Sequence, residues 1–431
     1  MRLETLEDAK GYLEGFINFE RRRDFDYESM GLGRIRALLE ALGRPERDLP
    51  CVHVAGSKGK GTVALASEAL LRAAGLRVGT YTSPHLESWT ERFRIDGEPV
   101  GADTMVGALR SMLPAVEKQR RDPRLRPTFF DVSTALALVL FRELGVDVGI
   151  MEVGLGGRLD STNAIESKVS VITAIQLEHT DKLGNTLELI CTEKAGIVRQ
   201  AIPVCHGPLA PGPYGVLAAR AVACDAPLHG VHPPEAQVGA KGLRFRLEDG
   251  HELTTPVLGA HQATNLAIAI RSCELFLERP LASGELDALA SLRLPARIEC
   301  FGRAILDCAH TPESARALRE TLSQIWPDRS WVVALSIAGD KDARGILTEL
   351  ASRARACVVT TAEPIRSLPP DELLELARAA GIEQSETAPD PATALLRAEE
   401  LARPEDLVVL TGSVYFAGAL RPLLLGRQQG R

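Results

Sequence analysis

Short apolar runs alternate with longer amphipathic segments along most of the chain. Runs rich in β-branched residues occur at Cys51–Ala55, Val146–Val153 and Val169–Thr173. Between them, Val63–Ala74 and Asp131–Leu144 have the length and apolar spacing of helices, and Asp131 is placed to cap the second helix. Strands that alternate with helices in this way predict an α/β fold with a mostly parallel sheet.

The pattern changes after the first half of the chain. Leu243–Leu247 and Leu253–Val257 flank the pair Asp249-Gly250, which predicts a hairpin with a tight turn, late in a first domain. Irregular sequence up to Pro295 is followed by new strand and helix patterns, such as the apolar run Trp331–Leu335. We therefore expect two domains, residues 1–295 and residues 296–431.

Composition excludes several classes of protein. The 431 residues include 45% hydrophobic and 25% charged residues with a net charge of −7, which argues against disorder and against a nucleic-acid partner. No apolar run approaches the roughly 20 residues of a membrane helix, and acids in Met1–Asp8 do not suit a signal peptide. Eight cysteines without a Cys-x-x-Cys pair suggest reduced thiols. We expect a cytoplasmic protein that does not bind membranes.

A glycine-rich loop follows the first predicted strand directly. Its sequence is Gly56-Ser57-Lys58-Gly59-Lys60-Gly61-Thr62, and a helix comes next. Glycines let backbone N–H groups turn toward an anion, and the helix dipole favours negative charge there. Lys60 would reach the outer phosphates of a nucleotide, and Thr62 offers a hydroxyl for Mg²⁺ or phosphate. The spacing departs from the common phosphate-loop pattern because Gly61 separates lysine from threonine, so a solvated basic turn is the alternative.

Further motifs follow in order along the chain, and together they resemble the folylpolyglutamate synthase and dihydrofolate synthase family of Mur-type ligases. The resemblance covers nearly the whole chain. Its motifs are Thr82-Ser83-Pro84-His85-Leu86, Glu152–Asn163, His179-Thr180-Asp181, Glu193–Ile197, His261–Asn265, Pro295-Ala296-Arg297, Asp307–Pro312, Asp340-Lys341-Asp342 and Gly412-Ser413. It implies a phosphate-loop domain like the central domain of Mur ligases and a smaller, Rossmann-like α/β domain at the C-terminus.

The resemblance also implies a reaction. Such enzymes use ATP to phosphorylate a carboxylate, and the amine of L-glutamate then displaces phosphate to form an amide. Two Mg²⁺ ions would neutralise the phosphates, with Ser83 and Glu152 resembling ligands of one ion and His179 a ligand of the other. Lys194 resembles the lysine that the family carries as a carbamate, which requires a neutral amine and therefore a lowered pKa.

The same resemblance implies binding residues for each substrate. Asn265, Arg297 and Asp307 would join the loop residues in holding the nucleotide, while His310, Lys341 and Ser413 would serve the glutamate and acyl-phosphate side. The pteridine substrate, dihydropteroate or a reduced folate, would contact an early loop, the start of a helix and the loop after Glu152. These pteridine-site residues are Leu32, Gly33, Arg34, Thr128, Phe130, Leu159, Asp160 and Ser161.

Several positions depart from the family pattern. Lys58 and Thr311 replace common asparagines, Cys308 a common glycine, Asp131 a common glutamate and Glu178 a common aspartate. A peptidoglycan Mur ligase is disfavoured, because 55 residues before Gly56 are too few for the extra domain of those enzymes. Two alternatives stay open, an enzyme restricted to folate tail extension and a catalytically silent nucleotide-binding regulator. The family implies a monomer.

Overall fold

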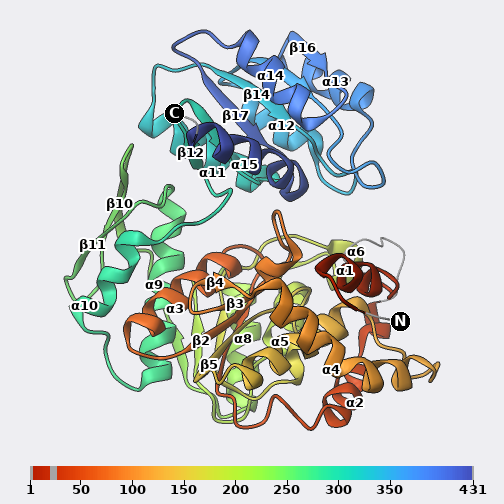
Figure 1. Cartoon of the computed structure of the whole chain (residues 1–431). Helices are drawn as coiled ribbons and strands as arrows, with labels where there is room; N and C mark the ends of the chain where they lie inside the picture. The colour runs from red at the N-terminus through yellow and green to blue at the C-terminus, as the bar shows by residue number, and fades with distance from the viewer. Residues whose placement is uncertain (1–2, 20–26, 430–431) are drawn as a thin grey trace. The chain divides into compact units, whose positions relative to one another are not determined.

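The computed structural model describes residues 3–19 and 27–429, and these form two compact units (Figure 1). The first unit runs to Pro234 and also includes Leu247–Leu253 and Ala263–Leu292. The second unit comprises Glu235–Arg246, Thr254–Gln262 and the chain from Arg293 onward. The chain therefore passes from the first unit to the second for the last time between Leu292 and Arg293, three residues before the domain boundary expected at 295/296. The expected boundary itself stays a prediction.

An eight-stranded sheet forms the centre of the first unit. Its order is β4-β3-β2-β5-β1-β6-β7-β8. Strands β2, β5, β1, β6, β7 and β8 pair in parallel with their neighbours in this order, and β3 and β4 form an antiparallel edge next to β2. The mostly parallel sheet expected from the sequence is confirmed. The strands are β1 Cys51–Ala55, β2 Val78–Tyr81, β3 Phe93–Ile95, β4 Glu98–Pro99, β5 Val148–Glu152, β6 Ser167–Ile172, β7 Val204–His206 and β8 Leu228–Gly230.

Helix α5, Phe129–Glu143, lies in the hydrophobic core of the first unit. Every residue from Phe129 to Phe141 is buried, as expected of a helix that is apolar on all faces. The expected cap was wrong: Thr128 is the N-cap, and Asp131 occupies the third helical position of a capping box with it.

The other helices are α1 Leu6–Glu14, α2 Gly33–Ala41, α3 Lys60–Ala73, α4 Ala102–Arg120, α6 Thr180–Leu183, α7 Leu187–Ala195, α8 Pro211–Ala223, α9 Ala260–Leu277 and α10 Ser283–Leu286, with short 3-10 turns η1 Tyr27–Met30, η2 Trp89–Arg92, η3 Ser161–Ala164 and η4 Asp287–Ser291.

The second unit is built on a six-stranded sheet. Its order is β12-β13-β17-β14-β15-β16, parallel except for the antiparallel β12. Two short polar strands, β12 and β16, gave no apolar run that the sequence analysis could recognise. The strands are β12 Glu299–Phe301, β13 Ala304–Leu306, β14 Trp331–Leu335, β15 Ala354–Val359, β16 Gln384–Thr387 and β17 Leu407–Thr411; the helices are α11 Pro312–Ile325, α12 Ala343–Ala351, α13 Pro370–Ala379, α14 Pro391–Leu401 and α15 Val414–Gln429.

The hairpin expected around Asp249-Gly250 is present, with a third strand added. The small sheet has the order β11-β10-β9, formed by Glu252–Thr255, Gly242–Arg246 and Glu235–Gly239. Strands β9 and β10 belong to the second compact unit rather than to the first, where the hairpin was expected. Val238 on β9 packs against the apolar core of that unit, which explains the difference.

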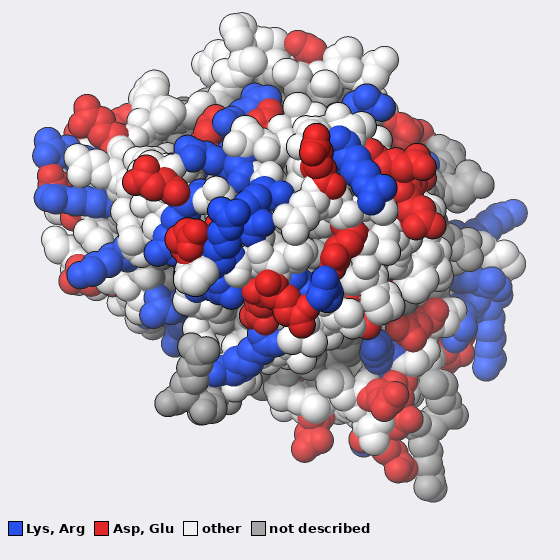
Figure 2. All heavy atoms as spheres, turned by 90° about the horizontal axis from the view of Figure 1, so that it is seen from above, with Lys and Arg blue, Asp and Glu red and all other residues white. Residues whose placement is uncertain are grey.

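The cysteines of the chain lie mostly in its interior. All eight cysteines are free, and all but Cys300 are buried. No helix in the described parts of the chain is long and apolar enough to cross a membrane. Lysine, arginine and acidic side chains are interspersed on the face shown in Figure 2. The expected cytoplasmic location stays a prediction.

Candidate active site

Two glycines shape the phosphate loop at positions where a side chain would be strained and would collide with its neighbours. Gly56 has φ +146°, and a Cβ there would lie 1.8 Å from Thr173 Oγ1. Gly59 has φ +88°, and a Cβ there would lie 2.3 Å from Asn265 Oδ1. Gly59 caps α3 without any side-chain hydrogen bond, so the first backbone N–H groups of the helix point toward the loop. The structure thus builds an anion cradle and places the expected Asn265 beside it.

The loop is anchored from β6 and the segment after it. Thr173 Oγ1 donates to the Lys58 carbonyl at 2.6 Å, and Ser57 N donates to the Ala174 carbonyl at 2.6 Å. Ser57 Oγ donates to the Gln176 carbonyl at 3.1 Å. These bonds fix the backbone of the loop before any ligand arrives. The sequence analysis did not identify Thr173 as a functional residue, because nothing in the local sequence indicates that a threonine at the end of a strand binds the loop.

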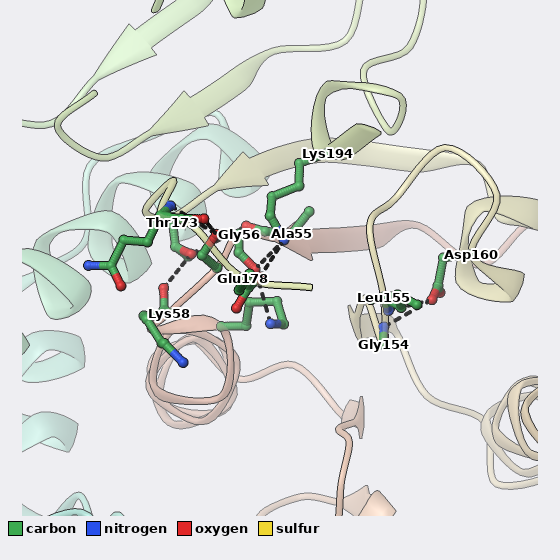
Figure 3. A network of polar contacts seen from close by, with 12 residues as sticks. Ala55, Gly56, Lys58, Gly154, Leu155, Asp160, Thr173, Glu178 and Lys194 are labelled. Carbon is green, nitrogen blue, oxygen red and sulfur yellow. Dashed lines mark hydrogen bonds and ion pairs between the residues drawn. The ribbon is translucent and has the colours of Figure 1, made fainter. Parts of the chain in front are cut away.

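Three charged side chains converge on the loop. Lys60 Nζ and Lys194 Nζ each donate to the Gly56 carbonyl at 3.0 Å, and Lys194 Nζ also donates to Glu178 Oε1 at 2.8 Å (Figure 3). Lys194 is 2% exposed. Glu178 appeared in the sequence analysis only as a departure from the family pattern. The structure makes it the partner of the candidate carbamate lysine.

The cluster perturbs the pKa values of its members. Burial lowers the pKa of Lys194, an effect that Glu178 opposes and Lys60 adds to. Burial would raise the pKa of Glu178, but Lys194, Lys60 and Lys58 outweigh it and lower the value to about 2. Glu178 is therefore ionised at neutral pH. The ion pair holds Lys194 in place, while burial moves its amine toward the neutral form.

These groups line a pocket that encloses about 230 Å³, including the part open to solvent. Its walls come from the phosphate loop, the loop after β5, and the segment that precedes α6. The lining residues are Gly56, Lys60, Val153, Gly154, Leu155, Gly156, Glu178, His179 and Lys194. The pocket lies beyond the carboxyl ends of neighbouring parallel strands, where α/β sheets bind ligands.

The expected metal ligands fall into two places in the first unit. Glu152 ends β5 and is 5% exposed, and its Oε2 accepts a hydrogen bond from Ser83 N at 3.2 Å. His179, exposed and with φ +46°, caps α6 and lines the pocket. Among the described residues, no group of three or more His, Cys, Asp or Glu side chains is placed so that it could hold a metal ion by itself. A single carboxylate such as that of Glu152 suits Mg²⁺, which binds through one or two carboxylates and keeps waters and phosphate oxygens as its other ligands.

Asp131 joins the three segments expected at the pteridine site. Its Oδ2 accepts bonds from Thr128 N and Oγ1, both at 2.8 Å, and lies 3.4 Å from Arg34 Nε. Its Oδ1 accepts a bond from Ser161 Oγ at 2.8 Å. The structure therefore brings Arg34, Thr128 and Ser161 together around one buried carboxylate. The sequence analysis treated Asp131 as a cap and a departure, and missed this role.

The remaining expected pteridine residues lie nearby. Leu32 and Gly33 begin α2, and Leu159 packs against a small cluster that contains Tyr27 and Leu183. Phe130 is 7% exposed, its ring is 5.9 Å from that of Tyr81, and a Cβ at Gly154 would collide with it. Phe130 thus packs in the core of the unit, as phenylalanine side chains commonly do.

Asp160 is fully buried and organises the loop after β5. Its Oδ2 accepts bonds from Gly154 N at 3.1 Å and Leu155 N at 2.9 Å (Figure 3). Its Oδ1 accepts bonds from Thr162 N at 3.0 Å and Thr162 Oγ1 at 2.6 Å. Burial raises its pKa to about 6, against these four bonds, which lower it. Asp160 thus shapes the wall of the phosphate pocket.

In the second unit, the expected residues follow three adjacent strands. His310, Ser413 and Lys341 come after β13, β17 and β14, which are neighbours and parallel, so they share the carboxyl edge of that sheet. Lys341 Nζ lies 3.1 Å from Asp340 Oδ2, and His310 Nδ1 donates to the Cys308 carbonyl at 2.8 Å. Ser413 Oγ accepts from Phe416 N at the start of α15.

Arg297 and Asp307 lie together in the same unit. Asp307 is 8% exposed and accepts bonds from Ile298 N at 2.9 Å and Ala309 N at 2.7 Å. Burial raises its pKa, and the nearby Arg297 opposes the shift. The carboxylate therefore fixes the turn that carries Arg297, in which Ala296 and Ile298 both have positive φ.

The two units define an ATP-dependent ligase of the Mur type. Residues 296–414 match the family model described as Mur ligase, glutamate ligase domain. The chain is 31% identical over 435 residues to the dihydrofolate synthase/folylpolyglutamate synthase of Bacillus subtilis, covering 97% of this chain and 99% of the relative. It is 35% identical over 440 residues to the protein of the same name from Mycobacterium tuberculosis, covering 91% and 89%. The chain belongs to the dihydrofolate synthase/folylpolyglutamate synthase family.

Solved structures agree with this assignment. The folylpolyglutamate synthase of Mycobacterium tuberculosis complexed with ADP superposes with a TM-score of 0.90 at 34% identity, covering 97% of this chain and 98% of that one. The Escherichia coli FolC in complex with DHPP and ADP superposes with a TM-score of 0.84 at 29% identity, covering 99% of both chains. The two-domain α/β fold expected from the resemblance is confirmed.

Proposed function

We propose that this chain ligates L-glutamate to dihydropteroate and to the γ-carboxylate of reduced folates, forming ADP and phosphate. The observation that carries the proposal is one pocket that joins a phosphate loop, a buried lysine and the loop organised by Asp160. Asp131 binds Ser161, the residue after Asp160, and so links this loop to Arg34 and Thr128. These groups would give a pteridine polar partners beside the phosphate site. The family membership and the ligand names of the similar structures support the same reaction.

The chain's own residues divide the work of phosphoryl transfer. The backbone N–H groups at the start of α3 and the Lys60 ammonium would hold the nucleotide phosphates as the substrate carboxylate attacks the terminal phosphorus. Arg297 and Asp307, with Asn265, would hold the rest of the nucleotide. The resulting acyl phosphate then takes the amine of glutamate and releases phosphate.

Glutamate would be held at the carboxyl edge of the second sheet. Lys341 would pair with a glutamate carboxylate, because a charge-assisted bond from an ammonium suits that group. His310 and Ser413 are proposed for the same substrate and for the acyl phosphate. The Lys341–Asp340 pair holds the ammonium at this edge, where a substrate carboxylate would exchange with Asp340.

Ser83, Glu152 and His179 would hold two Mg²⁺ ions, which supply charge neutralisation for the triphosphate. The buried carboxylate of Glu152 and its bond to Ser83 N support this assignment. We further propose that Lys194 reacts with CO₂ to form a carbamate. Its burial and lowered pKa support a fraction of neutral amine, which the reaction requires.

The test is release of phosphate from MgATP with L-glutamate, offering dihydropteroate in one reaction and tetrahydrofolate in another, and omitting each substrate in turn. Turnover with both is the expected result. Turnover with tetrahydrofolate alone would restrict the enzyme to tail extension. Silence with both despite measurable ATP binding would favour the catalytically silent regulator and overturn the proposal.

A further inference from the structure

A buried histidine in the first strand lies outside all the roles described so far. His53 is on β1, three residues before the phosphate loop, and none of its surface is exposed. Its Nε2 lies 2.9 Å from Thr162 Oγ1, on η3. Burial lowers the pKa of His53 to about 3, with Arg199 adding to the effect, so the ring is neutral at physiological pH. Burial of a polar ring costs stability unless the ring is hydrogen-bonded, so the bond to Thr162 offsets part of this cost.

The direction of the hydrogen bonds follows from their geometry. Thr162 Oγ1 uses its single proton to donate a hydrogen bond to Asp160 Oδ1 at 2.6 Å, so in its contact with His53 it accepts a hydrogen bond from Nε2. The neutral ring therefore carries its proton on Nε2. Among the described residues, His53 Nδ1 is a buried atom without a hydrogen-bond partner, as this tautomer allows for an acceptor. The bonds form one chain from β1 through Thr162 to Asp160.

The chain ends at the backbone that shapes the active site. Asp160 Oδ2 accepts from Gly154 N and Leu155 N, and both of those residues line the phosphate pocket. His53, Thr162 and Asp160 are each fully buried, so water does not compete for these bonds. We propose that His53 is a positioning residue, which holds Asp160 and the loop after β5 in register for the pteridine substrate. This inference rests on the proposed function of Asp160 at the pteridine site.

A matched pair of amides tests the proposal. In His53→Gln the amide nitrogen reaches the place of Nε2 and can donate to Thr162, whereas in His53→Asn it stops nearer Nδ1 and cannot. Both changes leave a buried amide, so they differ chiefly in this bond. Because loss of a buried hydrogen bond between neutral groups is worth up to about tenfold in an equilibrium constant, we expect His53→Asn to raise the KM for dihydropteroate by about tenfold and His53→Gln by no more than about twofold.

The KM for MgATP, measured on the same variants, is the internal control. The KM for MgATP should change less than the KM for dihydropteroate in both variants, since the phosphate loop itself is anchored separately by Thr173 and Ala174. A general loss of packing would instead change both KM values and lower kcat. Urea unfolding of each variant measures that loss directly.

A second pair keeps the test valid if His53→Asn fails to fold. Thr162→Val removes the hydroxyl and should raise the pteridine KM like His53→Asn, while Thr162→Ser keeps the bond and should stay near wild type. Equal KM values for dihydropteroate in the Asn, Gln, Val and wild-type proteins would overturn the inference alone. A wild type that turns over neither dihydropteroate nor tetrahydrofolate would overturn the proposed function, and this inference with it.

Discussion

The two units place candidate active-site residues beyond the carboxyl ends of parallel strands, yet they hold their charges differently. In the first unit, Lys194 and Glu178 form a buried ion pair, and Lys60 and Lys194 both donate to the Gly56 carbonyl. In the second unit, Lys341 is more accessible and pairs with an acid next to it in sequence. A preorganised cluster suits phosphoryl transfer, whereas a local, exchangeable pair suits capture of a small amino acid.

If the buried cluster is what phosphoryl transfer requires, Lys194→Ala should lower activity more than any other change considered below. Removal of a buried group at the phosphate pocket should lower kcat by about 10² to 10³, the size of loss seen for preorganised electrostatic groups. Acetate or another short carboxylate should restore part of the rate if a carbamate normally supplies the negative charge. The measurement is phosphate release under saturating substrates, with and without added carboxylate.

Two controls separate chemistry from folding in that experiment. Lys182→Ala removes a nearby lysine that pairs with Asp181 outside the pocket, and should keep near-normal activity. Lys194→Met combined with Glu178→Gln removes both members of the buried pair, so no unpaired carboxylate remains to destabilise the fold. Full activity of Lys194→Ala would contradict the carbamate hypothesis.

Glu152→Gln should come next in size. The change keeps the shape of the side chain but removes the charge proposed to hold Mg²⁺. We expect the Mg²⁺ concentration for half-maximal rate to rise by at least about tenfold, the lower limit for loss of a group that supports a metal site. A titration of rate against Mg²⁺ at fixed ATP measures the shift. An unchanged midpoint would remove Glu152 from the metal site.

Lys341→Ala should affect one substrate only. Loss of a charge-assisted hydrogen bond should raise the KM for glutamate by about tenfold to a hundredfold, with the KM for MgATP unchanged. Arg344→Ala is the matched control, because Arg344 is an exposed cation on α12 only three residues away. If both variants raise the glutamate KM equally, a general loss of positive charge explains the effect and the specific role of Lys341 is wrong.

The sequence predicted the central strands, the phosphate loop and the two-unit α/β architecture, because apolar runs and glycine spacing are local signals. It could not predict what Asp131 and Glu178 do. Asp131 binds groups from α2 and η3, and Glu178 meets Lys194 sixteen residues away only after the chain has folded. The polar strands β12 and β16 were missed for a related reason, since their place in the sheet depends on neighbours rather than on their own hydrophobicity.

Asp160 gives the smallest and most specific test, a pH-dependent difference in stability. Its pKa is about 6 in the folded chain against 3.8 for the ordinary carboxyl, so between these values the folded state holds a proton that the unfolded state has released. The free energy of unfolding should therefore fall as pH rises from about 4 to 6 and then level off, by at most about 3 kcal/mol for this group. Urea unfolding at each pH measures the slope.

Asp160→Asn isolates this contribution. The amide cannot ionise, so the difference between the wild-type and variant free energies of unfolding should follow the titration of Asp160 and become constant above pH 6. The amide nitrogen would also face backbone N–H groups of Gly154 or Thr162, which lowers stability at every pH without changing the slope. A difference that stays constant from pH 4 to 6 would mean that Asp160 is ionised throughout, and that the four hydrogen bonds outweigh its burial.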